Sequence, residues 1–195
     1  SAPAAPGAAD YLVVESTYGD RPHPLFAPQP ALRDVIRRTC ARGGVIVIPT
    51  FAVGRAQLLL LLIARLQAGG EIPRIPVYLD SPMAIDATEL FARFGTEHRL
   101  SAGEAATLGG IATLTRTAEQ SKALDRIREP AIILAASGMA TGGRVVHHLK
   151  VFATDARNTI LFSGFQAGGT RGAASTVAAV AIVSPRASPR DSSGR

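Results

Sequence analysis

The stretch GGVIVIPTFAVGRAQLLLLLIARLQAGG, residues 43–70, contains the alternation that defines the fold. Its first part, Val45–Thr50, is a continuous apolar run rich in β-branched residues, which is typical of a strand buried on both faces of a sheet. Its second part starts near Arg55 and is apolar on nearly every side of a helix, so it predicts a helix inside a core that ends at Gly69. A buried strand followed by a buried helix is one unit of a layered α/β domain.

The same alternation continues on both sides of this stretch. Apolar runs predict further strands, and helical periodicity predicts further helices between them. The expected strands cover 11–14, 75–80, 111–117, 131–137 and 159–165, and the expected helices cover 29–42, a segment through Ala87 and Phe94, 118–130 and 142–152. This order predicts an α/β domain with a mainly parallel sheet, flanked by helices that form right-handed crossovers.

Composition narrows the class of protein and its environment. The 195 residues carry a formal net charge of +6, which favours a polyanionic partner. Cys40 is the only cysteine, so no disulfide can form within the chain, and a reducing, cytoplasmic location is expected. The longest apolar run, 58–64, is far short of the roughly 20 residues that span a bilayer, so we expect no membrane association.

The ends of the chain differ from its middle. Residues 1–9 are rich in Pro and Ala without the features of a signal peptide, and we interpret them as a linker. Residues 10–172 form the expected α/β domain. Residues 173–195 end in a Ser/Pro/Arg-rich segment that predicts a disordered, low-complexity tail.

Each predicted strand ends in a loop of small and polar residues. In a parallel sheet these loops share the carboxyl edge, where open α/β sheets bind ligands. Arg55 and Arg144 each lie just inside a helix that follows such a loop, where a guanidinium suits phosphate. The alternative is that the Gly and Ser residues serve only as turn residues and that the arginines are solvated.

Several standard motifs are absent. The chain has no P-loop, no G-x-G-x-x-G and no G-x-S-x-G pattern. Its four histidines have no metal-binding spacing, and the consecutive His147 and His148 are expected to have a surface role.

Glu15 follows the predicted strand 11–14 directly. A carboxylate at the end of a buried strand costs free energy unless it is hydrogen-bonded or paired. Two interpretations stay open: a functional acid, or a turn acid bonded to the backbone of residues 16–19.

Five blocks, in this order and spacing, resemble the β-CASP segment of metallo-β-lactamase-fold RNA-processing nucleases. They are YLVVESTYGDR, GGVIVIPTFAVGRAQ, VYLDSPMA, ILAASGMATGGRVVHHLK and NTILFSGFQAGGTRG, and the resemblance runs from about residue 10 to about residue 172. It implies a β-CASP domain acting on RNA beside a metallo-β-lactamase domain of the same parent enzyme.

The resemblance also implies roles for particular residues. Glu15 matches an acid that stands beside a centre of two zinc ions without being a primary ligand, and it would orient the catalytic groups. The ASGM block implies that Ser137 and Gly138, with Gly143 and Arg144, hold substrate phosphate. The remaining candidates for the substrate cleft are Thr50, Arg55 and Ser81.

The family's zinc ligands come from an H-x-H-x-D-H motif and further histidines that this sequence does not contain. We therefore expect this chain alone to bind no catalytic zinc and to cleave no RNA. Two alternatives are a stand-alone nucleic-acid or nucleotide-binding module without hydrolysis, and a non-functional truncated gene product.

Overall fold

The sheet has five strands, and every pairing between neighbouring strands is parallel. The computed structural model describes residues 7–19, 28–98 and 100–175. The strands are β1 (Ile46–Pro49), β2 (Val77–Asp80), β3 (Thr113–Leu114), β4 (Ile132–Ala135) and β5 (Thr159–Ile160), in the order β3-β2-β4-β1-β5. The predicted α/β class is confirmed, and the sheet is parallel throughout the described residues.

The helices follow the order that the sequence predicts, with two additional α-helices among the described residues. They are α1 (Pro28–Ala41), α2 (Arg55–Ala68), α3 (Pro82–Arg93), α4 (Ala102–Gly110), α5 (Ala118–Leu124), α6 (Arg144–Phe152) and α7 (Arg171–Ser175), with a 3₁₀ turn at Gly95–Glu97. Helices α4 and α7 were not expected. The signal for α4 is local, because Ser101 and Glu104 form a capping box in which each side chain bonds the other residue's backbone N–H.

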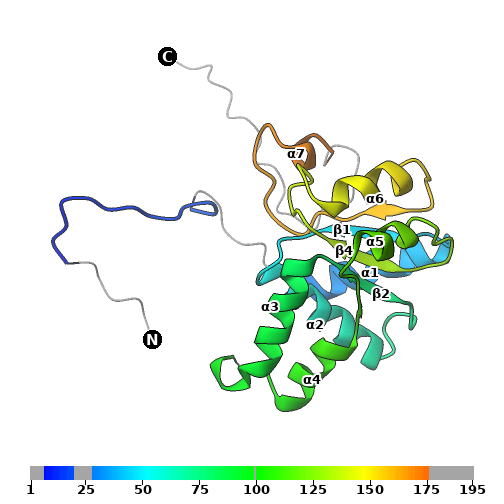
Figure 1. Cartoon of the computed structure of the whole chain (residues 1–195), viewed down its shortest axis with the longest axis horizontal. Helices are drawn as coiled ribbons and strands as arrows, with labels where there is room; N and C mark the ends of the chain where they lie inside the picture. The colour runs from blue at the N-terminus through cyan, green and yellow to red at the C-terminus, as the bar shows by residue number, and fades with distance from the viewer. Residues whose placement is uncertain (1–6, 20–27, 99, 176–195) are drawn as a thin grey trace.

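The core has two layers, one on each face of the sheet. Since side chains alternate along a strand, Ile46 and Ile48 of β1 face one layer while Val45 and Val47 face the other. The first layer is covered by α1, α2, α3 and α4, and the second by α5 and α6 (Figure 1). Helix α2 is the most buried, as its sequence predicts, with residues 59–64 all in the interior.

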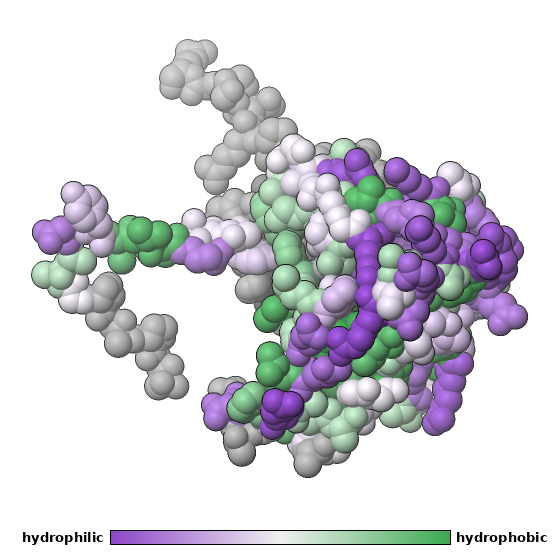
Figure 2. Space-filling model, viewed as in Figure 1, coloured by the Kyte–Doolittle hydropathy of each residue, from purple (hydrophilic) through white to green (hydrophobic). Residues whose placement is uncertain are grey.

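The predicted strand at 11–14 is wrong. Tyr11 is 92% exposed and Val13 is 98% exposed, and the segment belongs to no strand. Figure 2 shows it as a hydrophobic stretch of chain that stands clear of the body. A strand requires a neighbouring strand for its backbone hydrogen bonds, and the edge strands β3 and β5 pair with β2 and β1 and not with this segment.

Most of the predicted linker 1–9 and of the predicted tail 173–195 lies outside the described residues. Helix α7 reaches Ser175 and therefore extends a few residues past the predicted domain end at 172. Among the described helices, none has both the length and the apolar character needed to cross a bilayer.

Candidate nucleic-acid interface

A cleft of about 590 Å³ opens at the carboxyl edge of the sheet. Its walls come from the loops after β1, β4 and β5, from the start of α2 and from the N-terminal segment. The cleft therefore lies where the sequence places the ligand site of a parallel sheet. It combines aromatic side chains with two charged ones, Glu15 and Arg55.

Arg55 is the cation of the cleft. It is the first residue of α2, and its Nε and Nη2 atoms lie 3.8 Å from the position that a Cβ on Gly164 would occupy. Within the described residues, no acceptor bonds the Arg55 guanidinium. It stands beside the helix N-terminus, where backbone N–H groups also favour anions, so the two effects add for a phosphate.

Glu15 lines the same cleft, but its carboxylate is bonded locally. The Thr17 backbone N–H donates to Glu15 Oε1 at 2.8 Å. Hydrogen bonding from Thr17 holds the pKa of Glu15 below its usual value, so the group is ionised at neutral pH. This contact matches the turn-acid interpretation, and the catalytic role of Glu15 stays a prediction.

Aromatic rings form the apolar part of the cleft. Tyr18 and Phe165 meet edge to face with centroids 6.2 Å apart, and the Phe165 backbone N–H donates to Tyr18 Oη at 3.2 Å. Phe51, on the loop after β1, is 45% exposed. Exposed rings beside a cation are the combination that binds single-stranded nucleic acid, because bases stack on the rings while phosphates meet the charge.

Gly138 lies directly against Phe51, one of the aromatic residues that line the cleft. A Cβ at this position would lie 2.7 Å from Phe51 Cδ2 and 3.0 Å from the Phe51 backbone nitrogen. Only glycine lets the loop after β4 approach the loop after β1 so closely. Gly138 therefore shapes the cleft through Phe51.

The loop between β4 and α6, residues 136–143, is closed on itself by backbone hydrogen bonds. The Ser137 N–H donates to the Gly142 carbonyl at 3.3 Å, and the Val145 N–H donates to the Ala136 carbonyl at 2.9 Å. Gly143 has a φ of 74°, and a Cβ there would lie 2.5 Å from the Ala136 oxygen. The Ser137 hydroxyl is buried and has no hydrogen-bond partner among the described residues.

Thr50 and Ser81 are less available to a ligand. Thr50 is 1% exposed, and its hydroxyl donates to the Phe51 carbonyl at 3.3 Å. Ser81 is 4% exposed and is the N-cap of α3, where its Oγ accepts from the Ala84 N–H at 3.3 Å. Their role in substrate binding stays a prediction.

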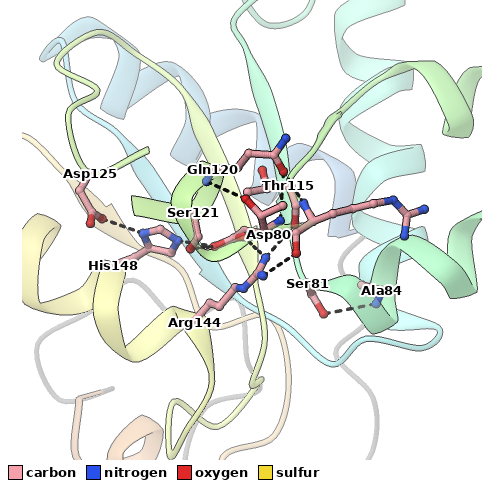
Figure 3. A network of polar contacts seen from close by, with 11 residues as sticks. Asp80, Ser81, Ala84, Thr115, Gln120, Ser121, Asp125, Arg144 and His148 are labelled. Carbon is pink, nitrogen blue, oxygen red and sulfur yellow. Dashed lines mark hydrogen bonds and ion pairs between the residues drawn. The ribbon is translucent and has the colours of Figure 1, made fainter. Parts of the chain in front are cut away.

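Arg144 lies apart from the cleft and bonds Asp80 at the end of β2 (Figure 3). His148, one turn further along α6, is fully buried and also bonds Asp80, whereas His147 is half exposed. The expected surface role is thus wrong for His148. Its burial follows from helical spacing, because residues 145, 148 and 152 form the buried face of α6.

Asp80 is a buried carboxylate that the sequence reasoning missed, although its signal was present. It ends a buried strand with a carboxylate, the same pattern that drew attention to Glu15. Burial alone raises the pKa of Asp80, but hydrogen bonds from His148, Ser121 and Arg144 outweigh burial and hold that pKa below its usual value.

The described residues do not fit a zinc centre. Across 7–19, 28–98 and 100–175, no three His, Cys, Asp or Glu side chains gather as a metal site requires. The acidic and histidine side chains around Asp80 already form hydrogen bonds and ion pairs with one another.

Fold and cleft together define an α/β domain with an aromatic cleft at the carboxyl edge of a parallel sheet, where Arg55 and Glu15 are the charged lining residues. The chain belongs to the Beta-Casp domain family, whose sequence profile matches residues 56–174. This match confirms the family that the five sequence blocks predict.

Named relatives support the same assignment. Ribonuclease TTHA0252 of Thermus thermophilus is 41% identical over 179 residues, which cover 88% of this chain and 41% of that protein. Transcription termination factor FttA of Methanosarcina mazei is 36% identical over 175 residues, covering 83% of this chain and 27% of that protein. Probable RNase MJ4 of Methanocaldococcus jannaschii is 30% identical over 165 residues, covering 84% of this chain and 37% of that protein. The chain thus spans less than half the length of these relatives.

Proposed function

We propose that this chain is the substrate-binding β-CASP portion of a zinc-dependent ribonuclease that hydrolyses RNA phosphodiester bonds in RNA processing or decay. By itself it binds single-stranded RNA without cleaving it, and a metallo-β-lactamase domain of the parent enzyme supplies the metal ligands. The names of two relatives, a ribonuclease and a probable RNase, support the substrate class. The single cysteine fits a cytoplasmic location.

The observation that carries this proposal is the guanidinium of Arg55. It lines the cleft beside three aromatic rings, at the N-terminus of α2, and no acceptor among the described residues bonds it. An RNA strand that stacks bases on Phe51 and Tyr18 brings a phosphate within reach of this cation. The loop at 136–143, which contains Ser137, Gly138 and Gly143, contacts a neighbouring part of the strand.

The experiment is a titration of a fluorescently labelled single-stranded RNA with the full chain at several salt concentrations. Arg55→Ala lowers affinity roughly tenfold, because a hydrogen bond to a charged group contributes about 1.5 kcal/mol or more. It also reduces the slope of log K against log salt by about 0.7, the value for one lost phosphate contact on a single strand.

Arg93→Ala is the matched control, because Arg93 is an exposed arginine on the last turn of α3. We expect it to leave both quantities unchanged. Equal losses for the two variants, or no RNA binding by the unaltered chain, would overturn the proposal. RNA incubated with the chain and added zinc stays intact; chelator-sensitive cleavage would contradict the part of the proposal that assigns the metal ligands to another domain.

A further inference from the structure

Arg144 is held by three protein acceptors. Its Nη1 donates to Asp80 Oδ1 at 2.7 Å and to the Thr115 carbonyl at 2.8 Å, and its Nη2 donates to the Arg116 carbonyl at 2.7 Å (Figure 3). These acceptors come from the end of β2 and from the segment after β3. The planar guanidinium fork therefore joins α6 to two other strand ends, and only 24% of the side chain is exposed.

Asp80 is the centre of this network. It is fully buried, and its Oδ2 accepts from the Ser121 hydroxyl at 2.6 Å and from His148 Nε2 at 2.7 Å. His148 Nδ1 lies 3.0 Å from Asp125 Oδ1, so each nitrogen of the ring faces a carboxylate.

The network acts on the loop at 136–143 through the chain itself. Arg144 directly follows Gly143, whose left-handed backbone turns the loop into α6. The Val145 N–H donates to the Ala136 carbonyl, so the two ends of the loop lie together next to Arg144, whose side chain bonds Asp80. A change in the Arg144 side chain therefore moves the loop end that carries Ser137 and Gly138.

We propose that Asp80, Arg144 and His148 are positioning residues for RNA binding: they set the geometry of the loop at 136–143, and Arg144 acts through Asp80 rather than by touching a phosphate. This inference rests on the proposed function, since it concerns the site at which RNA binds. It assigns to Arg144 a role other than the phosphate contact that the sequence resemblance implies.

The salt dependence of RNA binding separates the two roles. A positioning residue lowers affinity without changing the number of phosphates neutralised, whereas a phosphate ligand lowers the slope of log K against log salt by about 0.7. For Arg144→Ala we therefore expect a lower affinity with the slope unchanged. For Arg144→Lys, which keeps the charge, we expect a loss of affinity of about tenfold, the low end of what removing an outer partner of a site costs. Lysine retains the charge but cannot present the guanidinium fork to three acceptors.

Arg116→Lys is the matched control. Arg116 is the neighbouring arginine, and its side chain pairs with the exposed Asp86 and Glu89. The same substitution there should leave RNA affinity unchanged. Asp80→Asn should reproduce the Arg144→Lys loss, and the double variant should bind no worse than either single one, because both break the same link.

Ser121→Ala keeps the experiment decisive if the charged variants fail to fold. It removes only the hydroxyl that donates to Asp80, and we expect a two- to threefold loss of affinity at unchanged slope, because Arg144 and His148 still bond the Asp80 carboxylate when this one hydrogen bond is lost. The inference is overturned if Arg144→Ala lowers the slope by about 0.7 while Arg144→Lys, Asp80→Asn and Ser121→Ala bind RNA normally. Failure of the proposed function looks different, because then Arg55→Ala has no effect or the unaltered chain binds no RNA.

Discussion

Replacing Asp80 by asparagine should destabilise the chain strongly, although the two side chains have nearly the same size. Asparagine removes the negative charge that faces Arg144 and His148 in a fully buried position. Breaking a buried ion pair by removing one partner costs about 3–5 kcal/mol. We expect the lower end, about 3 kcal/mol, because the Arg144 side chain is 24% exposed and part of its charge therefore stays in contact with water.

Urea unfolding and thermal melting measure this cost. A loss of about 3 kcal/mol lowers Tm by roughly 6–12 °C for a chain of this size. Asp86→Asn is the matched control, since Asp86 pairs with Arg116 on the surface and such pairs contribute about 0–1 kcal/mol. If Asp80→Asn changed the free energy of unfolding by no more than about 0.5 kcal/mol, like an ordinary surface substitution, the buried network would not hold this edge of the fold together.

Three further outcomes follow from packing and ionisation. Leu60→Ala, in the centre of α2 and fully buried, should cost about 2–5 kcal/mol in urea unfolding, and a smaller loss would mean that the core collapses around the gap. Gly138→Ala should cost about 1–3 kcal/mol, because the new methyl group meets the Phe51 ring and backbone; unchanged melting would show that the loop shifts freely. Stability should fall as pH drops from about 5 towards 2. Hydrogen bonds from neighbouring arginines lower the pKa of Glu104 and of Asp155 to about 2, so both favour the folded state only while ionised. Urea midpoints at pH 7, 4 and 2.5 test this, and a flat profile would contradict it.

Local patterns account for most of the predicted architecture. The apolar run at 45–50 and the apolar helix after Arg55 became β1 and α2, and the remaining alternation became a parallel sheet with helices on both faces. Such patterns work because the period of buried residues, two in a strand and 3.6 in a helix, is a property of consecutive residues. The capping box of Ser101 and Glu104 was an equally local signal for α4 that was not used.

Other features depend on partners that are distant in the sequence. The run at 11–14 has strand composition, but no neighbouring strand among the described residues receives its hydrogen bonds. Composition reports that a segment can form a strand, and pairing decides whether it does.

The sequence by itself determined the class of fold, the edge of the sheet at which the cleft opens and the family to which the chain belongs. Only the tertiary structure decided which polar side chains face that cleft and which are bound inside the fold. Arg55 and Arg144 occupy equivalent places in the sequence, each at the start of a helix after a Gly-containing loop. Asp80 lies 64 residues before Arg144, and parallel pairing of β2 with β4 brings it within 2.7 Å. Arg144 therefore meets a buried carboxylate while Arg55 faces the cleft, because side-chain charges pair according to the register of the folded sheet, which no local stretch of sequence contains.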